Sequence, residues 1–221
     1  MSKRILMVVT TADTMKEGHK TGLWLSEFGE AYIEFEKRGY QMTVASPLGG
    51  KVPVDERSLE GGETPKEILD TAKYLEDTEK LEKIVGAMTF DAIFMPGGHG
   101  TMFDLPENDK LQHLIREFYE SNKIVASVCH GPAGLVGVTL SDGTPLVSGK
   151  TITAFTDEEE RETTLDQFMP FLLESRLREL GADFVTKPNW TDHVEVDGHL
   201  ITGQNPQSTI SVAKEVLNKL S

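Results

Sequence analysis

Short apolar runs alternate with helical patterns along most of the chain. Runs that are apolar almost throughout, which predict strands buried on both faces, occupy residues 4–10, 41–46, 91–95 and 123–129. Apolar positions spaced three or four residues apart predict helices over residues 22–37, from Pro106 onward, within 170–181 and over 207–220. This alternation predicts an α/β protein with a mainly parallel sheet and helices on both of its faces.

Weaker patterns fill the remaining sequence. Residues 64–85 are strongly charged with helical spacing, and residues 150–155 and 182–187 have the composition of strands. Two alternating runs within 193–203 flank an Asp-Gly pair and predict a small β-hairpin. No internal repeat, low-complexity stretch or composition break marks a linker, so we expect a single domain of residues 1–221.

Composition narrows the classes of function. The chain has 36 acidic and 22 basic residues, a formal net charge of −14, which repels phosphate backbones and anionic membrane surfaces. We therefore expect no nucleic-acid or membrane partner. The single cysteine excludes an intramolecular disulfide, and no apolar run approaches the ~18 residues of a membrane span. These features predict a cytoplasmic protein.

Glycine-rich or reactive residues follow three of the predicted strands. The sequence FMPGGHG follows the third strand, VCHGPAG the fourth and AFTDEEE the fifth. Ligands of open parallel sheets bind beyond the carboxyl ends of the strands. The sequence therefore predicts a functional site at this edge of the sheet.

Cys129 is either a small core residue that ends a strand or a nucleophile held at a sharp turn. It is followed by His130, Gly131 and a stretch predicted to be helical, which is the strand-turn-helix pattern of a nucleophile elbow. The start of that helix would favour the thiolate, and His130 is placed to exchange a proton with the sulfur. We interpret Cys129 as a reactive thiol.

Three further segments supply candidate partners for the thiol. Glu27 lies on the first predicted helix beside aromatic residues; it is either a solvated surface group or a carboxyl whose pKa is raised by burial. The N–H groups of Gly98 and His130 can form an oxyanion hole. One acid within 156–162 (TDEEERE) can orient His130 in a Cys-His-acid triad, but the pattern does not decide which acid.

Metal and nucleotide chemistry have little support in the sequence. The remaining histidines, His99 among them, show no metal-ligand spacing, and no P-loop or G-x-G-x-x-G motif occurs. We expect no metal and no cofactor. For Trp190 and the segment that follows it, core packing and a turn are the preferred interpretation.

The motifs together resemble one known family. SVCHGPAGL, FMPGGHGTMFD, TGLWLSE and ITAFTDEEE, supported by HLITGQNPQST and SPLGGKVPVDERSL, are similar to the ThiJ/PfpI superfamily over almost the whole chain. The resemblance implies a class I glutamine-amidotransferase-like fold, a flavodoxin-like three-layer sandwich. The most similar branch is the heat-shock glyoxalase III and chaperone group.

The resemblance also assigns roles to individual residues. It implies that Cys129 is the nucleophile with His130 beside it, that Glu27 is the acid contacting the thiol, and that Gly98 contributes to the oxyanion site. Glu160 matches the triad acid, with Asp157 and Glu159 as alternatives if the register is shifted. The residues expected beside the substrate are Gly97, Trp24 and Glu30.

One position departs from the family pattern. Members of this branch often have His-Pro where this chain has Glu30-Ala31. An extra carboxylate there would raise the pKa of Glu27 or alter the fit of the substrate.

The expected activity is that of a glutathione-independent glyoxalase III, which converts methylglyoxal or related α-oxoaldehydes to hydroxy acids through a cysteine hemithioacetal. Alternatives of the same superfamily are a protein deglycase, a cysteine amidase or peptidase, and a redox-responsive holding chaperone. The resemblance also implies a homodimer.

Overall fold

A seven-stranded sheet forms the centre of the molecule. We describe residues 2–62 and 64–221 of a computed structural model; the predicted single domain of residues 1–221 includes positions 1 and 63, which lie outside the described residues. The strands of the main sheet are β1 (Arg4–Val8), β2 (Gln41–Ser46), β3 (Glu79–Lys80), β4 (Ala92–Met95), β5 (Ile124–Val128), β8 (Val194–Asp197) and β9 (Leu200–Gly203). Their order is β3-β2-β1-β4-β5-β9-β8, and only the β8–β9 pair is antiparallel.

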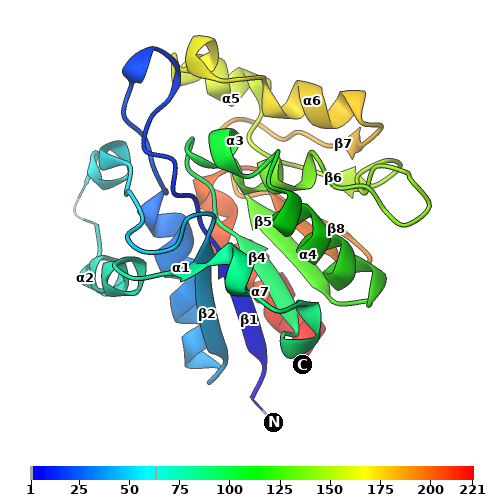
Figure 1. Cartoon of the computed structure of the whole chain (residues 1–221). Coiled ribbons are helices and arrows are strands. Elements are labelled where there is room, and N and C mark those ends of the chain that lie inside the picture. Colours follow the sequence, from blue (N-terminus) through cyan, green and yellow to red (C-terminus); the bar gives the residue numbers. More distant parts are fainter. Residues whose placement is uncertain (1, 63) are drawn as a thin grey trace.

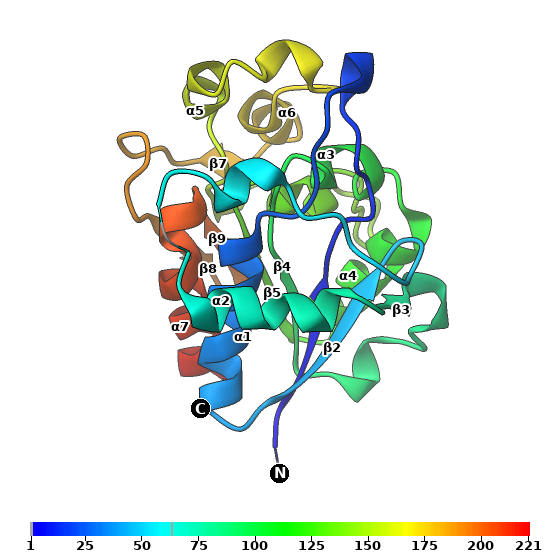
Figure 2. The ribbon, with the colours of Figure 1, turned by 90° about the vertical axis from the view of Figure 1, so that its left-hand side faces the viewer.

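Helices cover both faces of this sheet and lie beyond one of its ends. The helices are α1 (Leu25–Lys37), α2 (Lys66–Leu69), α3 (Thr101–Asp104), α4 (Asp109–Glu120), α5 (Asp157–Glu162), α6 (Leu173–Glu179) and α7 (Thr209–Leu220). Helices α1 and α7 pack together on one face, and α4 covers the other (Figures 1 and 2). Each face has its own buried apolar cluster, around Phe28 and Phe35 on the α1 side and around Leu114 and Phe118 on the α4 side. The predicted flavodoxin-like three-layer sandwich is confirmed.

The apolar runs become strands because both of their faces are buried. Every residue of β4 and β5 is inaccessible, and β1 is exposed only at its first residue. The predicted hairpin is also present: β8 and β9 pair across Asp197-Gly198, with Gly198 in the left-handed conformation. Helices α5 and α6 lie beyond the carboxyl ends of the strands (Figure 1), where the sequence predicts the site.

One prediction of secondary structure is wrong. Residues 64–85 do not form one helix: α2 is followed by a three-ten helix at Asp70–Leu75, and the chain then turns into β3. The backbone of Thr78 exchanges two hydrogen bonds with Gly50, and this extended pairing replaces the helical bonds.

The fifth and sixth predicted strands are present, but they lie outside the main sheet. They shorten to β6 (Thr151–Ile152) and β7 (Asp183–Phe184), which pair only with each other. The edge beside β9 is already occupied by β8, so a further parallel strand has no free edge there. The backbone N–H of Thr151 donates instead to the Asp197 carboxylate, at 2.8 Å.

Candidate active site

Cys129 stands at a sharp turn directly after β5. Its φ of 61° is left-handed, a conformation that costs a side-chain-bearing residue about 1–2 kcal/mol. Two backbone bonds hold the turn: the Cys129 N–H donates to Gly203, and the Cys129 carbonyl accepts from Phe155. The chain then enters a three-ten helix at Gly131–Leu135. The predicted elbow is therefore present, with a short three-ten helix after it rather than an α-helix.

The environment of the sulfur differs from the predicted one. Cys129 is 3 % exposed, and burial, followed by the charge of Glu27 and a hydrogen bond with it, raises the pKa of the thiol well above its usual value. The backbone N–H of His130, at the start of the three-ten helix, acts in the predicted direction and lowers the thiol pKa, but burial and Glu27 outweigh it.

Glu27 reaches the thiol from the first turn of α1. Trp24 precedes the helix, and its N–H bonds to the Gly97 carbonyl, which docks the start of α1 against the β4 loop. The Glu27 carboxyl is fully buried; Oε2 accepts from the Gly97 N–H at 2.5 Å, whereas Oε1 has no partner in the described chain. Burial raises the pKa of Glu27 to about 8, so the group exchanges protons near neutrality.

Glu30 affects the pKa of the Glu27 carboxyl through its charge. Burial raises its own pKa to about 7, and its charge adds a minor upward contribution to the pKa of Glu27. It is not among the described residues that line the cavity over Cys129. Two effects of having Glu30-Ala31 in place of His-Pro were considered: a raised pKa of Glu27 and a changed fit of the substrate. The structure supports the effect on the pKa of Glu27.

His130 and Glu160 form a buried pair on the other side of the sulfur. The Cys129 Sγ lies 3.4 Å from His130 Nδ1, and His130 Nε2 lies 2.5 Å from Glu160 Oε2. Burial acts to raise the pKa of Glu160, but its interactions with His130 and His99 outweigh burial and hold this pKa well below its usual value. Glu160 is therefore an ionised acceptor.

The neighbouring acids have other partners. Glu159 closes a capping box with Thr156 at the start of α5 and accepts from the side-chain amide of Asn205. Asp157 accepts from Ser175. Of the three acids considered for the triad, Glu160 is the one that contacts His130.

His99 is the site residue that the spacing analysis missed. It is 4 % exposed, its Nε2 lies 2.6 Å from Glu160 Oε1, and its ring centroid is 4.2 Å from that of His130. The two histidines are 31 residues apart in sequence and meet because β4 and β5 are adjacent in the sheet. His99 could have been recognised as a site residue from the sequence, because it belongs to the PGGHG turn at the same edge of the sheet.

A small apolar cavity of about 70 Å³ lies over the sulfur. It is lined by Trp24, Gly98, His99, Cys129, His130, Phe155, Thr163, Trp190 and Pro206. Assigning Trp190 to core packing is therefore wrong: its N–H bonds to Glu159, its indole to Glu162, and its ring closes the cavity against Phe155, with the ring centroids 5.6 Å apart.

The two glycines of the β4 loop permit a close approach of backbone to this site. Gly98 has a φ of 99°, and a Cβ there would lie 2.3 Å from the Gly22 carbonyl oxygen. A Cβ on Gly97 would lie 2.7 Å from the His130 nitrogen and 2.8 Å from Glu27 Oε2. Gly98 lines the cavity, whereas the N–H of Gly97 donates a hydrogen bond to the Glu27 carboxyl.

Potential metal ligands do meet here. The ligand atoms of His99, His130 and Glu160 lie within 4.8 Å of one another. The two nitrogen-to-oxygen distances of 2.5 and 2.6 Å are those of charge-assisted hydrogen bonds, however. Two ligands of one tetrahedral zinc ion, each about 2.0–2.2 Å from it, lie roughly 3.3 Å apart. The cluster as it stands fits proton sharing better than metal binding.

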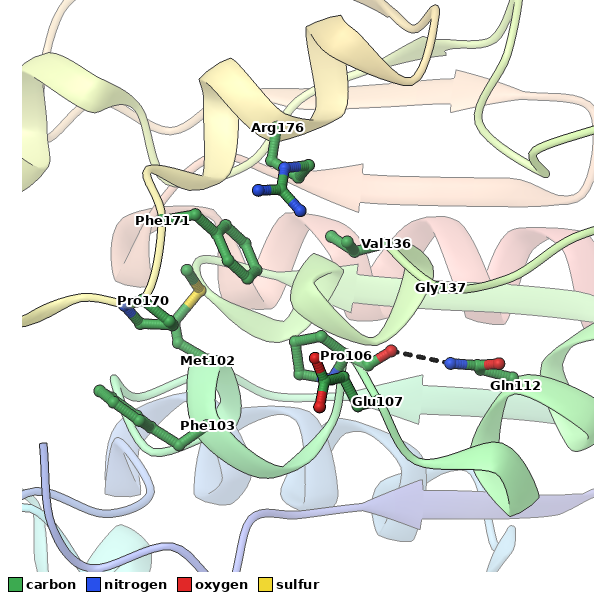
Figure 3. Close-up of a pocket in the computed structure, with 10 residues that line it drawn as sticks. All are labelled: Met102, Phe103, Pro106, Glu107, Gln112, Val136, Gly137, Pro170, Phe171 and Arg176. Atoms are coloured by element: carbon green, nitrogen blue, oxygen red, sulfur yellow. Dashed lines mark hydrogen bonds between the residues drawn. The ribbon is translucent and has the colours of Figure 1, made fainter.

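A larger cavity, of about 570 Å³, lies elsewhere between the α3–α4 region and α6 (Figure 3). Phe171 and Arg176 border it on one side and Pro106 and Glu107 on the other, with the guanidinium 4.7 Å from the Phe171 ring centroid. None of the thiol, its acids or its histidines lines this cavity. The larger of the two cavities therefore lacks the reactive groups, and we place the candidate site at the smaller cavity over Cys129.

The fold and the site, which combines a thiol, a histidine and two carboxyls, are those of a known protein family. Residues 8–219 match the model of the DJ-1/PfpI family, and the chain belongs to that family. The glutathione-independent glyoxalase HSP31 of Saccharomyces cerevisiae is 32 % identical, over 99 % of this chain and 98 % of the yeast protein.

Solved structures that resemble this chain also include a glyoxalase. The structure of glyoxalase III from Candida albicans has a TM-score of 0.88 at 28 % identity and covers 98 % of this chain and 96 % of its own. Another solved structure, described without an activity, is 53 % identical, with a TM-score of 0.94 and coverage of 100 % of this chain and 98 % of its own. In the described part of the chain, no helix has the length and apolar character needed to cross a membrane.

Proposed function

We propose that this protein is a glutathione-independent glyoxalase that converts methylglyoxal or a related small α-oxoaldehyde to the hydroxy acid through a covalent adduct on Cys129. One observation carries the proposal. A buried thiol lies between a carboxyl with a pKa of about 8, on Glu27, and a histidine bonded to an ionised glutamate, beneath a cavity of about 70 Å³. The names of the yeast and Candida relatives support the same activity.

The first step adds the sulfur to the aldehyde. His130 Nδ1, 3.4 Å from Sγ, accepts the thiol proton while Sγ bonds to the aldehyde carbon, giving a hemithioacetal oxyanion. The Gly98 N–H donates no hydrogen bond within the described chain, and the His130 N–H is directed at the sulfur. Both donors are therefore placed to stabilise the oxyanion until it takes back a proton.

The second step moves a proton along the substrate. The ionised fraction of Glu27 takes the proton from the former aldehyde carbon, and an enediol forms. Returning a proton to the adjacent carbon gives a thioester of the hydroxy acid. A carboxyl with a pKa of about 8 is suited to both halves of this transfer near neutrality. Hydrolysis of the thioester releases the hydroxy acid and restores the thiol.

The size of the cavity argues against the alternatives that act on a polypeptide. The cavity of about 70 Å³ over the sulfur is small, and Trp190 and Phe155 close one side of it. A peptide segment requires a longer cleft, which disfavours peptidase activity. The deglycase and holding-chaperone alternatives have no comparable support from the geometry.

The test is the formation of lactate from methylglyoxal by the wild type and by Cys129→Ala. We expect turnover by the wild type and loss of it in the variant. Equal rates from both proteins would reject the proposal. Suppression of aggregation that survives Cys129→Ala, in a protein without aldehyde turnover, would instead favour the chaperone alternative.

We further infer a homodimer, supported by the family resemblance, and a cytoplasmic location, supported by the single free cysteine. Val85 and Met88, 91 % and 79 % exposed, provide adjacent apolar surface suited to a partner subunit. Sedimentation of the purified protein tests the dimer, and fractionation of the source cells tests the location.

A further inference from the structure

The indole of Trp190 closes one side of the cavity over Cys129. Both residues line this cavity, and Cys129 is only 3 % exposed. The Trp190 ring packs edge-on against Phe155, with the centroids 5.6 Å apart, and Phe155 in turn packs against the His130 ring, with centroids 4.3 Å apart. A molecule larger than the cavity of about 70 Å³ must therefore displace one of its lining side chains before it meets the sulfur.

The backbone of Trp190 is held by buried groups. Its φ of 61° is left-handed, a conformation that persists in a residue with a side chain only where neighbouring contacts fix it. Its N–H donates to Glu159 Oε1 at 2.9 Å, and the next carbonyl, that of Thr191, accepts from the Asn205 amide at 2.8 Å. Glu159 and Asn205 are both inaccessible to solvent and bonded to each other. The main chain at Trp190 is therefore fixed independently of its side chain.

The ring of Trp190 has a more accessible anchor. Its indole N–H donates to Glu162 Oε2, and the other oxygen of this carboxylate accepts from the Asn189 amide at 2.9 Å. Glu162 is exposed, so water competes for its oxygens. Trp190 itself is 38 % exposed, so rotation about its side-chain bonds carries the indole into solvent rather than into a packed core. The ring can therefore leave the cavity while its backbone stays in place.

We propose that Glu162 is a positioning residue that controls access to Cys129 by holding the Trp190 indole against the cavity. Breaking the bond between the indole and Glu162 lets the ring turn outward, which opens the sulfur to molecules too large for the closed cavity. The role of Glu162 in selecting substrates rests on the glyoxalase function proposed above. Access to the thiol, however, is measurable without any turnover.

The experiment measures the rates at which the bulky N-phenylmaleimide and the small iodoacetamide alkylate Cys129, the only cysteine of the chain. Both reagents react with the thiolate, so the ratio of the two rates cancels any change in the thiol pKa. In Glu162→Ala we expect the rate with N-phenylmaleimide to rise about tenfold, as for loss of a hydrogen bond to a charged group. The rate with iodoacetamide should rise less, so the ratio increases.

Two variants of acidic residues on α5 serve as references. Glu162→Gln keeps a carbonyl oxygen that can accept from the indole, so its ratio should lie between those of the wild type and Glu162→Ala. The matched control is Glu158→Ala, which removes an exposed acid of the same helix and should match the wild type.

A double-mutant cycle tests whether Glu162 acts through the indole. Trp190→Phe keeps an aromatic ring beside Phe155 but lacks the N–H, so it should raise the ratio as Glu162→Ala does. In the Trp190→Phe background, Glu162→Ala should then add less than about twofold, because the bond that it removes is already absent. A full additional increase in that background would reject the proposal, since Glu162 would then act without the indole.

The remaining outcomes separate this proposal from its alternatives. An unchanged ratio in Glu162→Ala would show that contact with Phe155 alone holds the ring, and the proposal would fail. A parallel rise of both rates, with a lower free energy of unfolding in urea, would mean a general loosening of the fold and would equally reject it. A wild type that converts no α-oxoaldehyde rejects the proposed function, whereas the alkylation rates still decide the role of Glu162. If Glu162→Ala does not fold, as judged by circular dichroism, Trp190→Phe and Glu162→Gln are judged by the same ratio.

Discussion

The Cys129 sulfur lies 3.4 Å from Nδ1 of His130, the next residue in the chain. Neighbouring side chains on an extended strand point to opposite faces of the sheet, so this contact depends on the left-handed backbone of Cys129, with φ at 61°. Backbone bonds to Gly203 and Phe155 hold that conformation. The strain of the turn is the structural cost of placing a proton acceptor beside the sulfur.

Replacing the triad acid should disable the site. In Glu160→Gln the ionised acceptor shared by His130 and His99 is lost, and the amide can present an N–H to a ring N–H. We expect kcat for methylglyoxal to fall by about 10²-fold or more. The matched control is Glu158→Gln, which changes an exposed acid two positions away. Retained activity in Glu160→Gln would show that the contact is structural only.

The buried carboxyl of Glu27 should make stability depend on pH. Its pKa is raised from 4.5 to about 8 in the folded protein, so the folded state holds a proton that the unfolded state has lost between these values. The stabilisation is complete below about pH 4.5 and is lost as the pH rises through about 8. At ~1.4 kcal/mol per pKa unit, this amounts to a few kcal/mol.

Glu27→Gln removes that titration, and urea unfolding at about pH 5 and about pH 9 measures the effect. The free energy of unfolding should fall more between the two pH values in the wild type than in the variant. Glu30 contributes to the pH dependence of the unfolding free energy in both the wild type and Glu27→Gln, so the comparison isolates Glu27. Parallel pH curves for the two proteins would contradict the raised pKa.

Gly98 should tolerate no side chain. In Gly98→Ala the Cβ would meet the Gly22 oxygen at 2.3 Å and the Trp24 nitrogen at 2.6 Å, in addition to the penalty of a φ of 99°. Gly143 is the matched control, because its φ is 85° and nothing lies within 4 Å of an added Cβ. Gly143→Ala should cost about 1 kcal/mol, and thermal unfolding should show a clearly larger loss for Gly98→Ala. Equal losses would show that the β4 loop can move aside.

Trp190 should limit the size of the substrate. Its ring closes the cavity against Phe155, so Trp190→Ala should widen the site. We expect kcat/KM for phenylglyoxal, relative to methylglyoxal, to rise about tenfold, a value within the range for apolar pocket contacts. Steady-state kinetics with both aldehydes measures this ratio. An unchanged ratio in a folded variant would exclude Trp190 from the substrate pocket.

Several features of this protein were predictable from local sequence. The apolar runs of β1, β4 and β5 predict buried parallel strands, because a strand covered on both faces has no polar side. The elbow at Cys129 was predictable because the strand, the thiol and the glycine turn are consecutive. The presence of Glu27 on the first helix follows in the same way from helical spacing, although α1 begins at Leu25 and not at Gly22 as predicted.

Other features depend on contacts between distant segments. The residues 64–85 have helical spacing, but pairing of Thr78 with Gly50 competes with it. Spacing rules could not find His99, because its partner Glu160 is 61 residues away. They also could not choose among Asp157, Glu159 and Glu160, since a helix of six residues presents each acid to a different neighbour.

The sequence by itself determined the α/β layering, the elbow and the candidate thiol, because these depend on periodicity and on residues adjacent in the chain. The tertiary structure alone decided the ionisation of the site. Burial of Cys129 beside Glu27 raises the thiol pKa, and the meeting of His99 and His130 at Glu160 lowers the pKa of that carboxyl. Desolvation and charge pairing act through space, and both are defined only after the strands have brought these groups together.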